Sequence, residues 1–128
     1  MRFLIDTQLA FWWQTGDRKI PIEARTLVKQ SVEPVLVSRV SLWELAIKAN
    51  VGKLKIDLAL FAEQVSVIGF SWLPIENEHV LQVATLPLFD DHKDPFDRLL
   101  VAQSLSEPLI LLTTDAKLAC YGSTIRVV

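Results

Sequence analysis

Short apolar runs that alternate with helical patterns constrain the fold of this chain most strongly. Runs that are apolar at nearly every position are typical of strands buried on both faces of a sheet. The expected strands are residues 2–5, 35–38, 71–75 and 109–113, with an edge strand at 124–128. The expected helices are residues 9–13, 22–30, 41–50, 58–68, 77–85 and 95–105, with a short helical turn at 114–121. This alternation predicts an α/β layer fold with right-handed crossovers and a mainly parallel sheet.

Length and composition fit one globular domain that spans residues 1–128. Of the 128 residues, 51% are hydrophobic and 22% are charged, which excludes disordered and low-complexity classes. Apolar stretches such as 9–13 and 58–62 are far shorter than the ~20 residues of a membrane helix. A single cysteine, Cys120, excludes a disulfide framework and a cysteine-rich zinc site. No signal-peptide pattern precedes Asp6, so we expect a cytoplasmic protein without a membrane segment.

The charges are distributed unevenly along the chain. Residues 1–55 hold nine Lys or Arg against five Asp or Glu, whereas residues 56–128 hold four against ten. A basic half beside an acidic half is compatible with a nucleic-acid surface next to a metal site. An uneven distribution that arose by chance explains the same counts equally well.

Four acidic residues fall where a parallel sheet places its ligands. Asp6 and Asp115 directly follow expected strands, and Glu44 and Asp97 lie in the first turns of expected helices. Ligands of open parallel sheets bind at the carboxyl ends of the strands. Carboxylates gathered at one end repel each other and stay ionised only when cations neutralise them. Mg²⁺ or Mn²⁺ suits such hard oxygen ligands, lowers the pKa of a bound water and clamps a phosphoryl oxygen.

Helix capping is an alternative explanation for each acid. Asp6 and Asp115 are placed to cap the helical segments that follow them. Ser41 to Glu44 matches a capping box, in which the Glu44 side chain reaches back to the Ser41 amide. Asp94 precedes Pro95 as an N-cap, and Asp97 then favours the helix dipole. Caps and a metal site would occupy the same end of the sheet, so spacing alone leaves both open.

Several segments in order along nearly the whole chain carry a family resemblance. They are residues 4–7 with 11–13, 37–38, 41–48, 52–54, 86–88, 92–100 with 102–103, and 112–115 with Leu118 and Tyr121. The blocks 41–48 (SLWELAIK) and 94–103 (DPFDRLLVAQ) are the most specific of these. The sequence resembles the PIN-domain family and looks most like the VapC-type toxin ribonucleases of prokaryotic toxin–antitoxin pairs.

The resemblance implies a fold, a site and an activity. The fold would be a three-layer α/β/α sandwich with a mainly parallel sheet. The site would be an acidic pocket that holds one or two Mg²⁺ or Mn²⁺ ions and cleaves RNA. Its catalytic and metal-binding acids would be Asp6, Glu44, Asp97 and Asp115, oriented by the hydroxyls of Thr7 and Thr114. Gln8 is a departure, because relatives of this subgroup often carry His there.

The resemblance also implies partners. A cognate antitoxin protein would cover the acidic pocket, and the apolar surplus makes a homodimer plausible. Lys48 and Arg98 are candidates for contact with RNA phosphates, although a solvated surface explains them as well. His79 lies outside the shared segments, and we expect His92 to be a solvated loop residue near the pocket.

Two other function classes compete with the nuclease. A non-catalytic RNA-binding or scaffolding module of the same fold would bind RNA without turnover, but the complete acid set argues against it. A phosphoacceptor receiver domain needs paired acids after its first strand, and Asp6 has no acidic neighbour.

Overall fold

A computed structural model describes residues 2–128; Met1, the first residue of the predicted domain, lies outside the described residues. The elements in chain order are β1 (Phe3–Ile5), α1 (Thr7–Thr15), α2 (Ile22–Gln30), β2 (Leu36–Ser38), α3 (Arg39–Asn50), α4 (Leu58–Val67), β3 (Ser71–Leu73), α5 (Asn77–Val83), α6 (Pro95–Ser106), β4 (Ile110–Thr113), the 3₁₀ helix η1 (Ala116–Tyr121) and β5 (Ile125–Val127). Each element that the sequence predicts is present, with ends that differ by a few residues.

The strands form one five-stranded sheet in the order β3-β2-β1-β4-β5, and every neighbouring pair is parallel. β1 is the central strand, and its partners come from distant parts of the sequence: Ile5 aligns with Val37 of β2 and with Leu112 of β4. The chain builds β2 and β3 on one side of β1 and then crosses to build β4 and β5 on the other. This reversal lies where ligands of doubly wound sheets bind.

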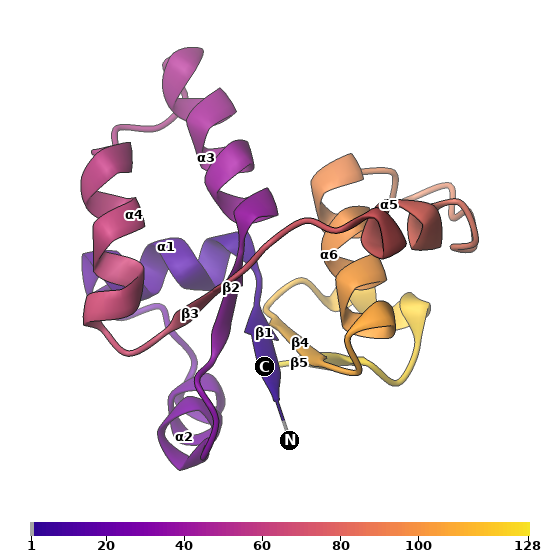
Figure 1. Ribbon diagram of the computed structural model, residues 1–128, viewed down its shortest axis with the longest axis horizontal. Helices are drawn as coiled ribbons and strands as arrows, with labels where there is room; N and C mark the ends of the chain where they lie inside the picture. The colour runs from indigo at the N-terminus through magenta and orange to yellow at the C-terminus, as the bar shows by residue number, and fades with distance from the viewer. Residues whose placement is uncertain (1) are drawn as a thin grey trace.

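Successive strand residues point to opposite faces of the sheet, and each face builds its own core. Phe3 and Ile5 of β1 pack into one cluster, with residues of α1, α2 and α4. Leu4 of β1 packs into the other cluster, with residues of α6, η1 and the segment that precedes α6. Figure 1 shows the sheet between α1, α2 and α4 on the left and α5 and α6 on the right. The predicted three-layer α/β/α sandwich with a mainly parallel sheet is confirmed.

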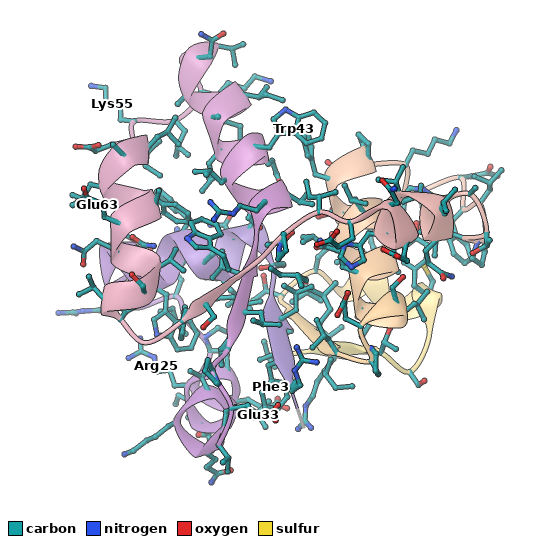
Figure 2. All side chains as sticks on the ribbon, in the orientation of Figure 1. Phe3, Arg25, Glu33, Trp43, Lys55 and Glu63 are labelled. Carbon is teal, nitrogen blue, oxygen red and sulfur yellow. The ribbon has the colours of Figure 1, made fainter. Side chains whose placement is uncertain are left out.

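One helix begins earlier than the sequence pattern predicts. α3 starts at Arg39 rather than Ser41, because the Ser38 side chain caps it by accepting a hydrogen bond from the Val40 amide at 3.0 Å. Ser41 is therefore inside the helix, and the predicted capping box between Ser41 and Glu44 is wrong. Further along α3, Trp43 projects toward α6 and packs edge-to-face on Phe96, with ring centroids 4.9 Å apart (Figure 2).

Within residues 2–128, no helix combines the length and the apolar character needed to cross a membrane.

Candidate metal centre

Asp6 connects the central strand to the first helix. It directly follows β1, is 6% exposed, and caps α1 because its Oδ1 accepts a hydrogen bond from the Leu9 amide at 2.9 Å. Its Oδ2 accepts a second hydrogen bond, at 2.6 Å, from the hydroxyl of Thr113 at the end of β4. The register that aligns Ile5 with Leu112 also places Asp6 beside Thr113. The carboxylate is therefore held at both oxygens.

Glu44 is placed in the second turn of α3 and is also buried. The Thr7 hydroxyl, from the start of α1, donates a hydrogen bond to Glu44 Oε1 at 2.8 Å, and Thr7 Oγ1 also lies 2.9 Å from Ser41 Oγ. The other carboxylate oxygen, Oε2, lies 2.9 Å from Nζ of Lys48 one turn later in the helix. The Thr7 hydroxyl therefore holds one oxygen of the Glu44 carboxylate, and its role at a metal site stays a prediction.

Asp97 lies in the first turn of α6. Asp94 caps this helix, since its Oδ1 accepts hydrogen bonds from the amides of Phe96 at 2.9 Å and Asp97 at 3.0 Å. The capping interpretation of Asp94 is therefore confirmed, but Asp94 also faces the same cavity as Asp97. The sequence pattern predicted Asp94 only as a cap and not as one of the site acids.

Asp115 follows β4 and caps η1 through a 3.0 Å hydrogen bond from the Lys117 amide. The hydroxyl that links this segment to the other acids belongs to Thr113, not to the predicted Thr114. Thr113 donates to Asp6 and accepts a 3.0 Å hydrogen bond from the Asp115 amide. Thr114 lies on the cavity wall. The sequence pattern did not indicate Thr113, because its contact with Asp6 joins segments 107 residues apart through the pairing of β1 with β4.

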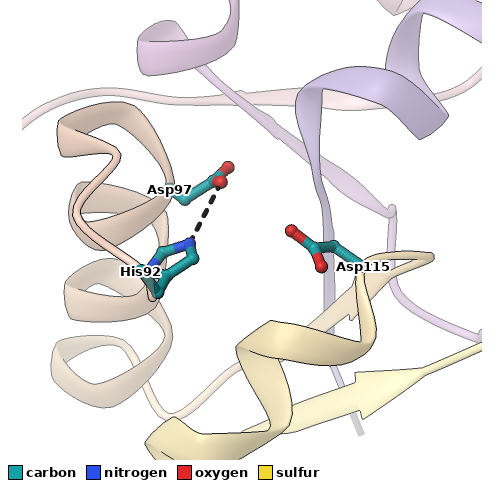
Figure 3. A group of neighbouring side chains, drawn as sticks. All are labelled: His92, Asp97 and Asp115. Carbon is teal, nitrogen blue, oxygen red and sulfur yellow. Dashed lines mark hydrogen bonds and ion pairs between the residues drawn. The ribbon is translucent and has the colours of Figure 1, made fainter. Parts of the chain in front are cut away.

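All four predicted acids line one cavity of about 520 Å³ at the carboxyl ends of the central strands. The other lining residues are Thr7, Gln8, Phe11, Leu45, Lys48, Lys53, Leu54, Asp94 and Thr114. Figure 3 shows Asp97 and Asp115 pointing toward one another from α6 and from the segment after β4. Ligand atoms of His92, Asp97 and Asp115 all lie within 4.8 Å of one another. Segments more than 100 residues apart in the sequence thus meet here.

Two of the acids are held in an environment that disfavours their charge. Burial raises the pKa of Asp6 to about 6, and the charges of Glu44 and Asp115 raise it too, against the lowering effect of the hydrogen bonds from Thr113 and Leu9. Burial also raises the pKa of Asp97 to about 6, helped by the charges of Asp94, Glu44 and Asp6 and opposed by the hydrogen bond with His92. Both shifts come mainly from burial, and the neighbouring negative charges add to them.

This donor set fits a divalent cation. Four carboxyl groups supply hard oxygen ligands, which Mg²⁺ and Mn²⁺ prefer over nitrogen or sulfur. Among the described residues, Lys48 forms the one Lys or Arg ion pair with these four acids, on Glu44. Burial is the main cause of the raised pKa of Asp6 and of Asp97, and a cation bound between the acids would offset the neighbouring negative charges that add to it.

Two residues beside the cavity are placed differently from the prediction. His92 is 5% exposed, so the expectation of a solvated loop residue is wrong; its Nε2 lies 3.3 Å from Asp97 Oδ2 and its Nδ1 lies 2.8 Å from the Tyr121 hydroxyl. Arg98 is buried as well, and its Nη1 donates to the Pro87 carbonyl and to the Tyr121 hydroxyl, both at 2.9 Å. This burial argues against the predicted contact of Arg98 with RNA. Sequence position could not reveal it, because the partners are 11 and 23 residues away.

A family model described as the PIN domain matches residues 3–122, which is most of the chain. No match was found among curated proteins.

Solved structures with the same fold include two VapBC assemblies and a toxin–antitoxin complex. VapBC2 from Rickettsia felis, bound to a DNA fragment from its promoter, matches with a TM-score of 0.69 at 14% identity, covering 100% of this chain and 98% of that one. DNA-bound VapBC from Salmonella typhimurium matches with a TM-score of 0.66 at 15% identity, covering 100% and 97%. A toxin–antitoxin complex from Klebsiella pneumoniae matches with a TM-score of 0.64 at 14% identity, covering 97% and 95%. Similarity at this level of identity establishes the shared fold.

Proposed function

The chain belongs to the PIN-domain family, and from that premise we propose that it is a metal-dependent endoribonuclease toxin of a toxin–antitoxin pair. The observation that carries the proposal is the meeting of Asp6, Glu44, Asp97 and Asp115 on one cavity. These residues come from four separate segments, yet the fold brings their carboxyl groups to the carboxyl ends of β1, β2 and β4. Helix capping by itself does not account for Glu44 or Asp97, because the caps of α3 and α6 are Ser38 and Asp94.

The four acids would hold one or two Mg²⁺ or Mn²⁺ ions. When bound, such an ion lowers the pKa of water and polarises a phosphoryl oxygen, which is the chemistry that phosphodiester hydrolysis needs. The chain's own contribution is to fix the acids: Thr113 and the Leu9 amide hold Asp6, and Thr7 holds Glu44. Carboxylates whose oxygens are held by hydrogen bonds in this way are pre-organised, so that metal binding requires little rearrangement of the side chains.

RNA is the proposed substrate, and lysines at the cavity are its proposed phosphate contacts. Lys48 and Lys53 both line the cavity, and both are exposed enough to meet a solvent-borne strand. Lys48 already lies against Glu44, so a phosphate approaching the acids would meet its ammonium group at the same place. Phosphate contacts of this kind supply affinity without sequence information.

A cognate antitoxin is the proposed protein partner, since the structural relatives described above include toxin–antitoxin assemblies. An antitoxin that covers the acidic cavity would keep RNA away from it. We extend the proposal to a homodimer and to a cytoplasmic location, in keeping with the apolar surplus and the single cysteine of the sequence.

The test is cleavage of a mixed RNA pool by antitoxin-free protein in Mg²⁺, in Mn²⁺ and in EDTA. The proposal predicts cleavage in at least one metal, loss of cleavage in EDTA, and recovery when the metal is restored. RNA affinity that persists in EDTA, together with no cleavage in either metal, would instead support a non-catalytic RNA-binding module.

A further inference from the structure

His92 is a buried polar residue beside the acids, and the proposed mechanism does not use it. It lies in the segment before α6, where its amide donates a 3.3 Å hydrogen bond to the Phe89 carbonyl. Its ring packs edge-to-face on the Tyr121 ring, with centroids 5.3 Å apart. Figure 3 shows the imidazole directly below Asp97, joined to it by the hydrogen bond. Backbone and ring contacts therefore fix the orientation of the imidazole.

A chain of hydrogen bonds determines which nitrogen of His92 carries the proton. Arg98 can only donate, so the Tyr121 oxygen is the acceptor of the 2.9 Å bond between them. The Tyr121 proton is then free to be donated to His92 Nδ1, which is 2.8 Å away. In the neutral imidazole an accepting Nδ1 leaves the proton on Nε2. Nε2–H therefore donates to Asp97 Oδ2 at 3.3 Å.

The direction of this last bond does not depend on the charge of the ring. A protonated imidazole carries protons on both nitrogens, so Nε2 still donates to Asp97. The opposite neutral tautomer would place an unprotonated Nε2 against a carboxylate oxygen at 3.3 Å, with lone pair facing lone pair. It would also leave the buried Tyr121 hydroxyl proton without the Nδ1 acceptor.

We propose that His92 is a positioning residue for the metal centre: through Arg98 and Tyr121 it is held as a donor to Asp97 Oδ2, which fixes the rotation of a carboxylate that would hold the cation. The inference rests on the proposed function, because it assigns His92 a role toward the same metal site. Partners that orient a ligand in this way are worth roughly 10–100-fold in metal affinity or activity.

The test is a calorimetric titration of Mn²⁺ into the full-length wild type, His92→Leu, His92→Gln and Tyr121→Phe. We expect His92→Leu to weaken binding roughly 10–100-fold. His92→Gln should recover most of the affinity, because its amide places a donor close to the position of Nε2. Tyr121→Phe should fall between the wild type and His92→Leu, since it keeps the ring packing and loses only the hydroxyl.

A matched control comes from the chain's other buried histidine. His79 is fully buried and its Nε2 contacts Glu107 at 2.8 Å, between α5 and α6. His79→Leu should lower the melting temperature without changing Mn²⁺ affinity. If His92→Leu weakens binding only as much as His79→Leu does, the role of His92 is structural and the proposal is overturned.

A spectroscopic readout separates positioning from direct ligation. In Mn²⁺-loaded wild type, electron spin echo spectra should lack the strong ¹⁴N coupling of a coordinated imidazole, and strong coupling would overturn the proposal by making His92 a ligand. RNA turnover should show a lower kcat with an unchanged KM in His92→Leu. Wild type that binds no Mn²⁺ would overturn the proposed function and this inference with it, whereas tight and equal binding by wild type and His92→Leu would overturn this inference alone.

Discussion

At the scale of single residues, two effects on Asp6 oppose each other: its hydrogen bonds stabilise the fold, whereas its burial disfavours the charged carboxylate. Its side chain caps α1 and accepts the Thr113 hydroxyl, so it stabilises the fold locally. Burial nevertheless disfavours its charge and raises its pKa to about 6. A charge retained at such a cost is expected where a ligand needs it.

This conflict predicts how stability depends on pH in the metal-free protein. The pKa of Asp6 is about 6 in the folded state against about 3.9 in the unfolded state, so between these values the folded state binds more protons. The contribution of Asp6 to the free energy of unfolding therefore falls as the pH rises from about 4 to about 6. The loss is on the order of 2–3 kcal/mol at neutral pH.

The variant Asp6→Asn should remove this loss, because Asn caps helices about as well as Asp and carries no charge. Denaturant unfolding in EDTA should find Asp6→Asn more stable than wild type at pH 7, with a smaller difference at pH 4.5. The same pH slope for both proteins would contradict the account of Asp6.

At the scale of elements, several acids that line the cavity are also the residues that cap helices. Asp6, Asp94 and Asp115 cap α1, α6 and η1, and all three face the cavity. Carboxylates favour helix N-termini because free amides and the helix dipole attract negative charge there. Capping and metal binding are therefore compatible uses of one residue, and the two interpretations left open by the sequence are not exclusive.

Two variants of Asp94 separate its cap from its charge. Asp94→Ala should lower the free energy of unfolding by about 1 kcal/mol, since α6 loses the acceptor of two amides. Asp94→Asn should keep that stability. Both should lower the pKa of Asp97, because each removes a neighbouring charge that raises it.

NMR titration of the Asp97 carboxyl carbon in EDTA measures this second effect. An Asp97 pKa that is unchanged in Asp94→Asn would contradict the proposed repulsion between the two acids.

The elements were predictable from the sequence because their signals are local. Apolar runs, caps such as Asp57 and Asp94, and breakers such as Gly52 act within a few residues, so every strand and helix was found. The start of α3 was missed because the choice between Ser38 and Ser41 as cap depends on where β2 ends. His92 and Arg98 were misplaced, and Thr113 was missed, because their roles come from contacts between segments. Local pattern carries no information on such contacts.

At the scale of the whole molecule, the fold brings charged residues of the basic and the acidic half of the chain together at one cavity. Lys48 and Lys53 come from the basic half, and Asp94, Asp97 and Asp115 come from the acidic half; all five line the same cavity. A cation between the acids would leave the lysines available for phosphates.

Metal binding at this cavity should stabilise the whole fold. A ligand that binds only the folded state raises the free energy of unfolding by about 2.7 kcal/mol when its free concentration is 100 times its Kd. For a chain of this size, that corresponds to a rise of roughly 10 °C in melting temperature. Thermal melts in Mg²⁺ or Mn²⁺ against EDTA check this in wild type. Asp97→Asn should lose most of the rise, and a full rise in that variant would place the metal elsewhere.

The lysines should give RNA binding its salt dependence. Lys53→Ala should weaken RNA binding and reduce the slope of log affinity against log salt by about one, as expected for one lost phosphate contact. Lys29, which is exposed on α2 and does not line the cavity, offers a matched control in Lys29→Ala. Equal slopes for the two variants would argue against RNA passing Lys53.

RNA cleavage by Asp97→Asn beside Asp57→Asn tests directly whether the acidic cavity is the metal centre of a ribonuclease. Both variants replace an Asp by its neutral isostere, but Asp97 lies on the acidic cavity whereas Asp57 caps α4 away from it. If the cavity is the metal centre of a ribonuclease, Asp97→Asn should cleave far more slowly than wild type, and Asp57→Asn should cleave at the wild-type rate. Wild-type cleavage by a folded Asp97→Asn would contradict the account.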